Sequence, residues 1–96
     1  MTSPQKVEAR LYVARDCRLC EELRDQLEEL TEELPLQIEE IDITGVPELE
    51  AEFSAEIPVL FLNGRKAVKY RISTEALRQR VRRAAGQRGL GTWFLR

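Results

Sequence analysis

The chain has 96 residues, of which 43% are hydrophobic and 33% are charged, and its net charge is −2. This length allows one small globular domain and excludes a multidomain enzyme. The polar start, residues 1–5, holds no signal-peptide core, and the apolar run at residues 59–62 is too short to cross a membrane. We therefore expect a cytoplasmic protein with no membrane partner.

The charge is divided unevenly along the chain. Residues 1–56 carry 16 acidic and 5 basic side chains, whereas residues 57–96 carry 1 acidic and 10 basic side chains. We interpret this division as solvated faces of different helices. A dipolar surface that orients an encounter partner is the alternative. The arginines are not interleaved with exposed aromatic side chains until the last few residues, so we expect no nucleic-acid partner. We also expect a monomer.

The first half of the chain predicts a strand followed by a long helix. Residues 7–14 alternate apolar with polar or amphipathic side chains, which is the period of a strand. Beyond Cys17, apolar residues recur at helical spacing, and Pro35 ends this pattern. The apolar members of the helix are Leu19, Cys20, Leu23, Leu27, Leu30 and Leu34.

A second strand and a short helix are predicted next. Residues 36–43 are typical of a strand, with a change of apolar phase at Glu39-Glu40 that indicates a bulge. Gly45 breaks the chain, and Pro47 suits the first turn of a short helix that carries Leu49 and Phe53.

The second half predicts a hairpin and a last helix. Residues 57–62 form a mostly buried strand, Asn63-Gly64 a tight turn, and residues 65–71 the returning strand. Ser73 or Thr74 caps the last helix, and Gly86 ends it. The inward residues of this helix are Leu77, Val81, and Ala84 or Ala85.

The predicted order is β-α-β-α-β-β-α, which is an α/β fold. The opening strand, helix and strand imply a right-handed parallel crossover, and the hairpin adds an antiparallel edge. We therefore predict a four-stranded mixed sheet flanked by helices. Residues 1–96 form a single domain with a core at about residues 7–86 and a C-terminal tail at residues 87–96, whose Trp93 and Phe94 pack against the domain or bind a partner.

The most informative feature is the pair of cysteines, Cys17 and Cys20, where the first strand enters the first helix. Dithiol chemistry needs one exposed, readily ionised sulfur and a second sulfur close enough to attack the mixed disulfide. The helix N-terminus favours an anion at Cys17. Cys20 shares a face with Leu23 and Leu27, so we expect Cys17 to be the nucleophile and Cys20 a more buried resolving thiol.

Charged neighbours act on the Cys17 thiol in both directions, and we expect a moderately lowered pKa. The basic neighbours Arg15 and Arg18 lower the pKa, whereas the acidic neighbours raise it. The acidic neighbours are Asp16, Glu21 and Glu22.

Other interpretations of the pair stay open or are excluded. Cys20 could be a small core residue and Cys17 incidental, which would suit a non-catalytic binding module. A structural zinc site is disfavoured because it normally needs four ligands, and the chain has two cysteines and no histidine. Hydrolases that use a histidine base are excluded. An iron–sulfur cluster shared across a dimer remains an alternative.

Three segments together resemble a known family. Residues 11–22, which contain Cys17-Arg18-Leu19-Cys20-Glu21, residues 41–43 and residues 56–60 are similar to the glutaredoxin-like branch of the thioredoxin superfamily. The small bacterial members with the motif Cys-x-Leu-Cys-Glu are the most similar.

The resemblance implies a thioredoxin-like fold and thiol–disulfide oxidoreductase activity, with disulfide-containing proteins or small thiols as substrates. It also implies a cis Ile57–Pro58 bond beside the cysteine pair, with the backbone of Ile57 binding an extended substrate or glutathione. Pro58 would then shape the substrate loop.

The sequence departs from typical glutaredoxins in two ways. Their Gly-Gly segment, which holds the glutathione backbone, is replaced here by residues 67–74, and the residues between the cysteines are Arg18 and Leu19. We therefore expect no tightly bound cofactor. Glutathione stays open as a ligand, with Lys69 or Arg71 to attract its carboxylates, but we favour a solvated edge at these residues. The electron donor stays open between glutathione and thioredoxin reductase.

Overall fold

The computed structural model describes residues 6–94, with side chains described through residue 86. Its elements follow the predicted order β-α-β-α-β-β-α. They are β1 (Val7–Val13), α1 (Arg18–Leu30), β2 (Leu36–Asp42), α2 (Pro47–Phe53), β3 (Val59–Leu62), β4 (Arg65–Lys69) and α3 (Thr74–Phe94). None of the helices in the described part is both long and apolar enough to span a membrane.

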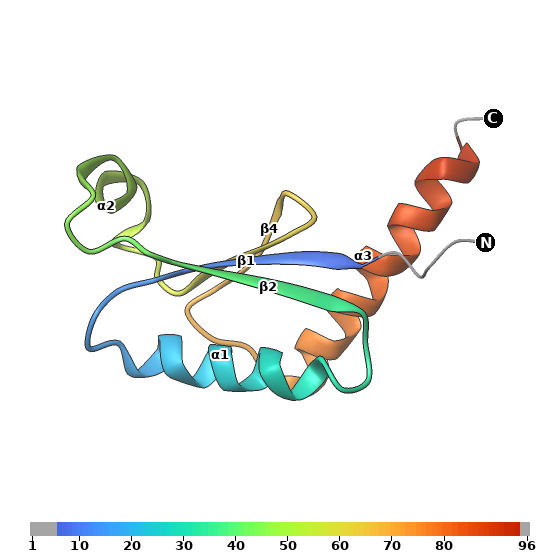
Figure 1. Cartoon of the computed structure of the whole chain (residues 1–96), viewed down its shortest axis with the longest axis horizontal. Helices are drawn as coiled ribbons and strands as arrows, with labels where there is room; N and C mark the ends of the chain where they lie inside the picture. The colour runs from blue at the N-terminus through green and yellow to red at the C-terminus, as the bar shows by residue number, and fades with distance from the viewer. Residues whose placement is uncertain (1–5, 95–96) are drawn as a thin grey trace.

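The strands form one mixed sheet in the order β2-β1-β3-β4. β1 and β2 run parallel, from Val7 beside Leu36 to Val13 beside Asp42, while β3 is antiparallel to both β1 and β4. Figure 1 shows α1 and the start of α3 below the sheet and α2 above one end of it. The predicted four-stranded mixed sheet is confirmed.

Strand alternation divides the core between the two faces of the sheet. On the face of α1 and α3, fifteen buried residues form the main cluster, which includes Leu11, Cys20 and Leu77. On the other face, Ile43, Phe53 and Val59 form a smaller cluster. Burial on the main face therefore holds the first turns of α1 against β1 and places the cysteines at the end of that strand.

The predicted bulge at Glu39-Glu40 is wrong. β2 pairs with β1 without interruption, and the register shift lies instead between Leu60 and Phe61, where β3 meets β4. The apolar residues of β2 shift from one face of the strand to the other, because the two ends of the strand pack against different core clusters. Ile38 packs against the main cluster, whereas Ile43, just beyond β2, belongs to the cluster under α2.

Two predicted helix ends are also wrong. α1 ends at Leu30 rather than Leu34, because the next residues form tight turns before Pro35, which disfavours helix in its predecessor. α3 continues through Gly86 to Phe94. A glycine within a helix costs only about 1 kcal/mol relative to alanine, so it need not end one. The predicted packing of Trp93 and Phe94 concerns side chains outside the described residues.

The predicted hairpin turn and the predicted cap of the last helix are confirmed, whereas the predicted end of β4 is wrong. Asn63 and Gly64 both have positive φ, at 50° and 84°, as a two-residue hairpin turn requires. Ser73 caps α3, since its hydroxyl oxygen accepts the Ala76 N–H at 3.1 Å. β4 ends at Lys69, two residues earlier than predicted, because Tyr70 turns the chain with a φ of 69°.

Candidate functional site

The cysteines lie at the carboxyl end of β1. A short loop leaves Val13, passes through Asp16 with a φ of 53°, and reaches Cys17, the N-cap of α1. The Cys17 sulfur accepts the backbone N–H of Cys20 at 3.1 Å. An N-cap sulfur therefore lies among the unpaired N–H groups of the helix, where negative charge is stabilised.

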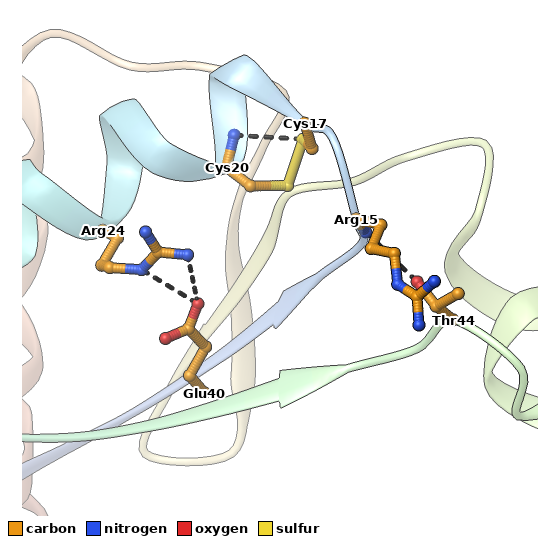
Figure 2. The surroundings of a disulfide bond; sticks show 6 residues. All are labelled: Arg15, Cys17, Cys20, Arg24, Glu40 and Thr44. Atoms are coloured by element: carbon orange, nitrogen blue, oxygen red, sulfur yellow. Dashed lines mark hydrogen bonds and ion pairs between the residues drawn. A yellow bond between two sulfur atoms is a disulfide. The ribbon is translucent and has the colours of Figure 1, made fainter.

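Cys17 and Cys20 are joined as a disulfide, with their Cα atoms 5.2 Å apart (Figure 2). Cys20 is 1% exposed and packs within the main core cluster, whereas Cys17 is partly exposed at its edge. The predicted difference in burial between the two sulfurs is confirmed. Cys17 is thus open to solvent in part, whereas Cys20 is enclosed by the core.

A depression of about 400 Å³ opens beside Cys17. Its charged lining residues are Arg15, Asp16, Glu21, Arg24, Glu40 and Asp42. Within it, Arg24 from α1 binds Glu40 from β2, with Nη2 to Oε2 at 2.7 Å and Nε to Oε2 at 3.0 Å. Carboxylates outnumber guanidinium groups in this lining, so the surface next to the exposed sulfur has net negative charge.

A hydrogen-bond relay fixes the loop before Cys17. The Arg15 backbone N–H donates to the Thr44 hydroxyl at 3.2 Å, and the Thr44 N–H donates to Asp42 Oδ1 at 2.9 Å. The hydrogen bond from the Thr44 backbone, with help from the Thr44 hydroxyl and the charge of Arg15, lowers the pKa of Asp42 below its ordinary value. Asp42 is thus ionised at neutral pH and holds the turn at Thr44. The bond from Arg15 to Thr44 is drawn in Figure 2.

Ile57 and Pro58 lie next to this loop. In the antiparallel pairing of β3 with β1, Val59 is opposite Tyr12, and continuing this register places Pro58 opposite Val13 and Ile57 opposite Ala14. The Ile57–Pro58 bond is cis, as the resemblance implied. Pro58 is fully buried, and Ile57 contacts both core clusters. No hydrogen bond involves the backbone of Ile57 within the described part of the chain.

Only some of the charged residues predicted to act on the Cys17 thiol lie beside it in the structure. Arg15, Asp16 and Glu21 line the depression, but Arg18 and Glu22 do not. Glu22 instead lies 3.6 Å from Arg71, an ion pair that draws its carboxylate away from the depression.

Two sets of contacts that shape the site were not predicted from the sequence. The Arg24–Glu40 pair and the relay through Thr44 join α1 and the loop to β2, contacts that only the folded chain reveals. The short spacing of Asp42 and Thr44 is a signal for a local side-chain turn and could have been found. Across residues 6–86, no group of three or more carboxylates and thiols is arranged to hold a metal ion.

Comparison with known proteins identifies related chains. Residues 8–82 match the family model of the "Glutaredoxin-like domain (DUF836)". Uncharacterized proteins of Mycobacterium tuberculosis and Mycobacterium bovis are 33% identical to this chain in an alignment of 89 residues that covers 88% of this chain and 89% of theirs.

Solved structures share the fold at lower identity. A protein of Nitrosomonas europaea matches with a TM-score of 0.69 and 22% identity, covering 84% of this chain and 98% of its own. A mutant thioredoxin from Halobacterium salinarum matches with a TM-score of 0.64 and 20% identity, covering 84% and 76%. Fasciola hepatica thioredoxin matches with a TM-score of 0.60 and 19% identity, covering 82% and 81%. The thioredoxin-like fold is confirmed by these matches.

Proposed function

This chain belongs to the glutaredoxin-like domain (DUF836) family, and from that premise we propose that it is a thiol–disulfide oxidoreductase that works through Cys17 and Cys20. The observation that carries the proposal is the pair itself. A partly exposed sulfur at a helix N-cap is within bonding distance of a buried sulfur one turn along. Dithiol exchange needs this arrangement of an accessible attacker and a sheltered resolver.

The proposed reaction begins with both cysteines reduced. The Cys17 thiolate attacks one sulfur of a substrate disulfide, a mixed disulfide forms, and the other substrate sulfur leaves as a thiolate that takes a proton from water. Cys20 then loses its proton and attacks the Cys17 sulfur. The second substrate thiol is released, the Cys17–Cys20 disulfide forms, and the substrate has gained two electrons. A thiol reductant in the cell returns the pair to the dithiol.

The surroundings of Cys17 assign roles to other residues. The helix N-terminus stabilises the Cys17 thiolate, and the relay through Thr44 and Asp42 holds the loop on which this thiolate stands. The unpaired backbone of Ile57, with Pro58 behind it, is available to bind an extended substrate segment. We propose that the protein acts as a cytoplasmic monomer.

The charges of the depression bear on the choice of substrate. Glutathione carries a net negative charge, and the depression beside Cys17 is itself net negative. We therefore propose disulfide-containing proteins or uncharged small disulfides as substrates in preference to glutathione mixed disulfides.

Replacing each cysteine in turn tests the mechanism. In Cys17→Ser, we expect disulfide reduction to fall to the uncatalysed rate, a loss of at least about a hundredfold, because no attacking thiolate remains. In Cys20→Ser, we expect a mixed disulfide on Cys17 to accumulate, which intact-mass spectrometry detects. Retained activity in Cys17→Ser, or failure of the wild-type pair to form an internal disulfide, would contradict the proposal.

The same variants separate the alternatives. A non-catalytic binding module would keep its partner when both cysteines become serine, and Cys17 would be alkylated no faster than an ordinary thiol. An iron–sulfur cluster shared by two copies of the chain would give visible absorbance and a dimer after anaerobic reconstitution, and both would be lost in Cys17→Ser.

A further inference from the structure

The segment at residues 55–58, which includes the Ile57–Pro58 bond, is held in place from the β4 side. The backbone N–H of Tyr70 donates to the Pro58 carbonyl at 3.0 Å, and the Tyr70 hydroxyl donates to the Ala55 carbonyl at 3.0 Å. Between them, Lys66 binds the Glu56 carboxylate at 2.9 Å. The segment is therefore attached at its start, middle and end to β4 and to the residue that follows it.

Tyr70 is an unusual residue for its backbone conformation. Three described residues other than glycine have positive φ, and they are Asp16, Asn63 and Tyr70. Aspartate and asparagine tolerate this region, whereas a bulky aromatic residue there is uncommon. Burial does not explain the choice, since Tyr70 is 46% exposed. Tyrosine supplies two groups that glycine could not, namely the hydroxyl that binds the Ala55 carbonyl and the ring over which the Lys69 ammonium lies at 5.7 Å. Tyr70→Phe removes the hydroxyl and keeps the ring.

The two bonds of Tyr70 leave the other side of the segment open. Ile57 lies between the anchored carbonyls of Ala55 and Pro58, and its own N–H and C=O make no hydrogen bond in the described part of the chain. An extended substrate segment can pair with these groups only if they stay in one place. The hydrogen bonds to the Ala55 and Pro58 carbonyls hold the segment in one place and leave the N–H and C=O of Ile57 available for pairing.

We propose that Tyr70 is a positioning residue that holds residues 55–58 so that Ile57 pairs with an extended polypeptide disulfide. This inference rests on the proposed function and narrows the substrate class. It assigns to the site disulfides that lie within polypeptide segments, because only these offer a backbone for Ile57 to pair with. A small disulfide reaches Cys17 without that pairing.

The test compares Tyr70→Phe with two substrates, a short peptide that carries a disulfide and hydroxyethyl disulfide. Removal of one anchoring hydrogen bond is expected to raise the KM for the peptide about fivefold while kcat changes less than twofold. The KM for hydroxyethyl disulfide is expected to change less than twofold. Tyr12→Phe is the matched control, since it removes the other tyrosine hydroxyl, on a ring that stacks on Phe53.

Three outcomes would overturn the proposal. They are an unchanged peptide KM in Tyr70→Phe, an equal rise in KM for both substrates, and the same change in Tyr12→Phe. Tyr70→Gly, which relieves the positive φ and removes the hydroxyl, should raise the peptide KM at least as much as Tyr70→Phe does.

A second readout separates this inference from the proposed function. If the wild-type protein reduces neither substrate, the proposed function fails, and amide hydrogen exchange still tests the anchoring. The amide of residue 70, which donates to the Pro58 carbonyl, should exchange faster in Tyr70→Phe than in the wild type or Tyr12→Phe. An unchanged exchange rate at residue 70 in Tyr70→Phe would overturn the positioning role.

Discussion

A loop with a residue other than glycine at positive φ lies at each end of β1. The two loops differ in which of their groups are left without a hydrogen-bond partner. At the amino end, Asn63 has a φ of 50°, its N–H donates to the Glu8 carbonyl at 2.8 Å, and its Oδ1 accepts the Glu8 N–H at 2.9 Å. At the carboxyl end, Asp16 has a φ of 53° and leads into Cys17. The turn at Asn63 bonds to the chain around it, whereas the loop at Asp16 presents a sulfur to solvent.

This difference distinguishes a structural turn from a functional one. A positive φ at a residue other than glycine has a cost in free energy at either end, and the surrounding structure must offset it. At the hairpin, the side chain of Asn63 offsets that cost through its own hydrogen bonds. At the cysteine end, the relay from Asp42 through Thr44 supports the loop while Cys17 and the Ile57 backbone stay available. Variants at each end can test whether stability and activity separate in this way.

The largest effect on stability is expected at the hairpin. Asn63→Ala removes the bond from the Glu8 N–H and the 3.4 Å bond from Asn63 Nδ2 to the Ala84 carbonyl, and it places alanine at positive φ. We expect the free energy of unfolding to fall by about 1–3 kcal/mol. Urea unfolding measures this loss, and kcat/KM for disulfide reduction should change less than about twofold.

Two matched variants sharpen this prediction. Asn63→Gly loses the same side-chain bonds but tolerates the φ, so its loss should be smaller than that of Asn63→Ala. Asp16→Ala puts the same strain at the other end, where it should lower both stability and kcat/KM. Equal effects of Asn63→Ala and Asp16→Ala on kcat/KM would show that the two ends do not differ in function.

Low pH should destabilise the loop before Cys17, because Asp42 becomes protonated. Its pKa is lowered in the folded protein by the Thr44 hydrogen bond, so its stabilising contribution is present above the unfolded pKa of about 3.9. That contribution is lost as the pH falls through the lower folded pKa. Asp42→Asn should therefore be less stable than the wild type at pH 7, and the two proteins should converge near pH 2 in urea unfolding.

Asp25→Asn serves as the control for this pH dependence. Asp25 is an exposed aspartate on α1 that makes no side-chain hydrogen bond in the described part of the chain. Its replacement should leave the difference in stability between pH 7 and pH 2 close to that of the wild type. If Asp25→Asn and Asp42→Asn behaved alike, the relay through Thr44 would contribute nothing specific to the loop.

Features of the site that depend on local sequence patterns were predicted, whereas features that depend on tertiary contacts were not. The helical phase of Cys20 with Leu23 and Leu27 predicted which sulfur is buried, and Asn63-Gly64 predicted the hairpin. The change of apolar phase along β2 predicts a bulge that the structure lacks, because the strand's own residues do not reveal that α2 covers one end of the sheet. The Tyr70 anchor was missed because its hydroxyl binds a carbonyl fifteen residues earlier in the chain.

The smallest effect is expected at the ion pair beside Cys17. Arg24 and Glu40 are each about one-third exposed, and solvent screens pairs of this kind, so Glu40→Gln should cost no more than about 1 kcal/mol of stability. The variant also removes one negative charge from the depression. We expect reduction of oxidised glutathione to rise about twofold at low salt and that of the cationic disulfide cystamine to fall by a similar factor, with both changes lost in 0.5 M salt.

Glu39→Gln separates this local effect from a change in net charge. Glu39 binds Arg10 at 3.2 Å, and strand alternation puts it on the opposite face of the sheet from Glu40. Both variants remove one carboxylate from one exposed ion pair on β2, so any difference between them reports on the position of the charge relative to Cys17. If Glu39→Gln shifted the preference between the two disulfides as much as Glu40→Gln, the depression would have no selective role. A shift confined to Glu40→Gln would show that charge at the cysteine end acts on the substrate, while charge on the opposite face of the same strand does not.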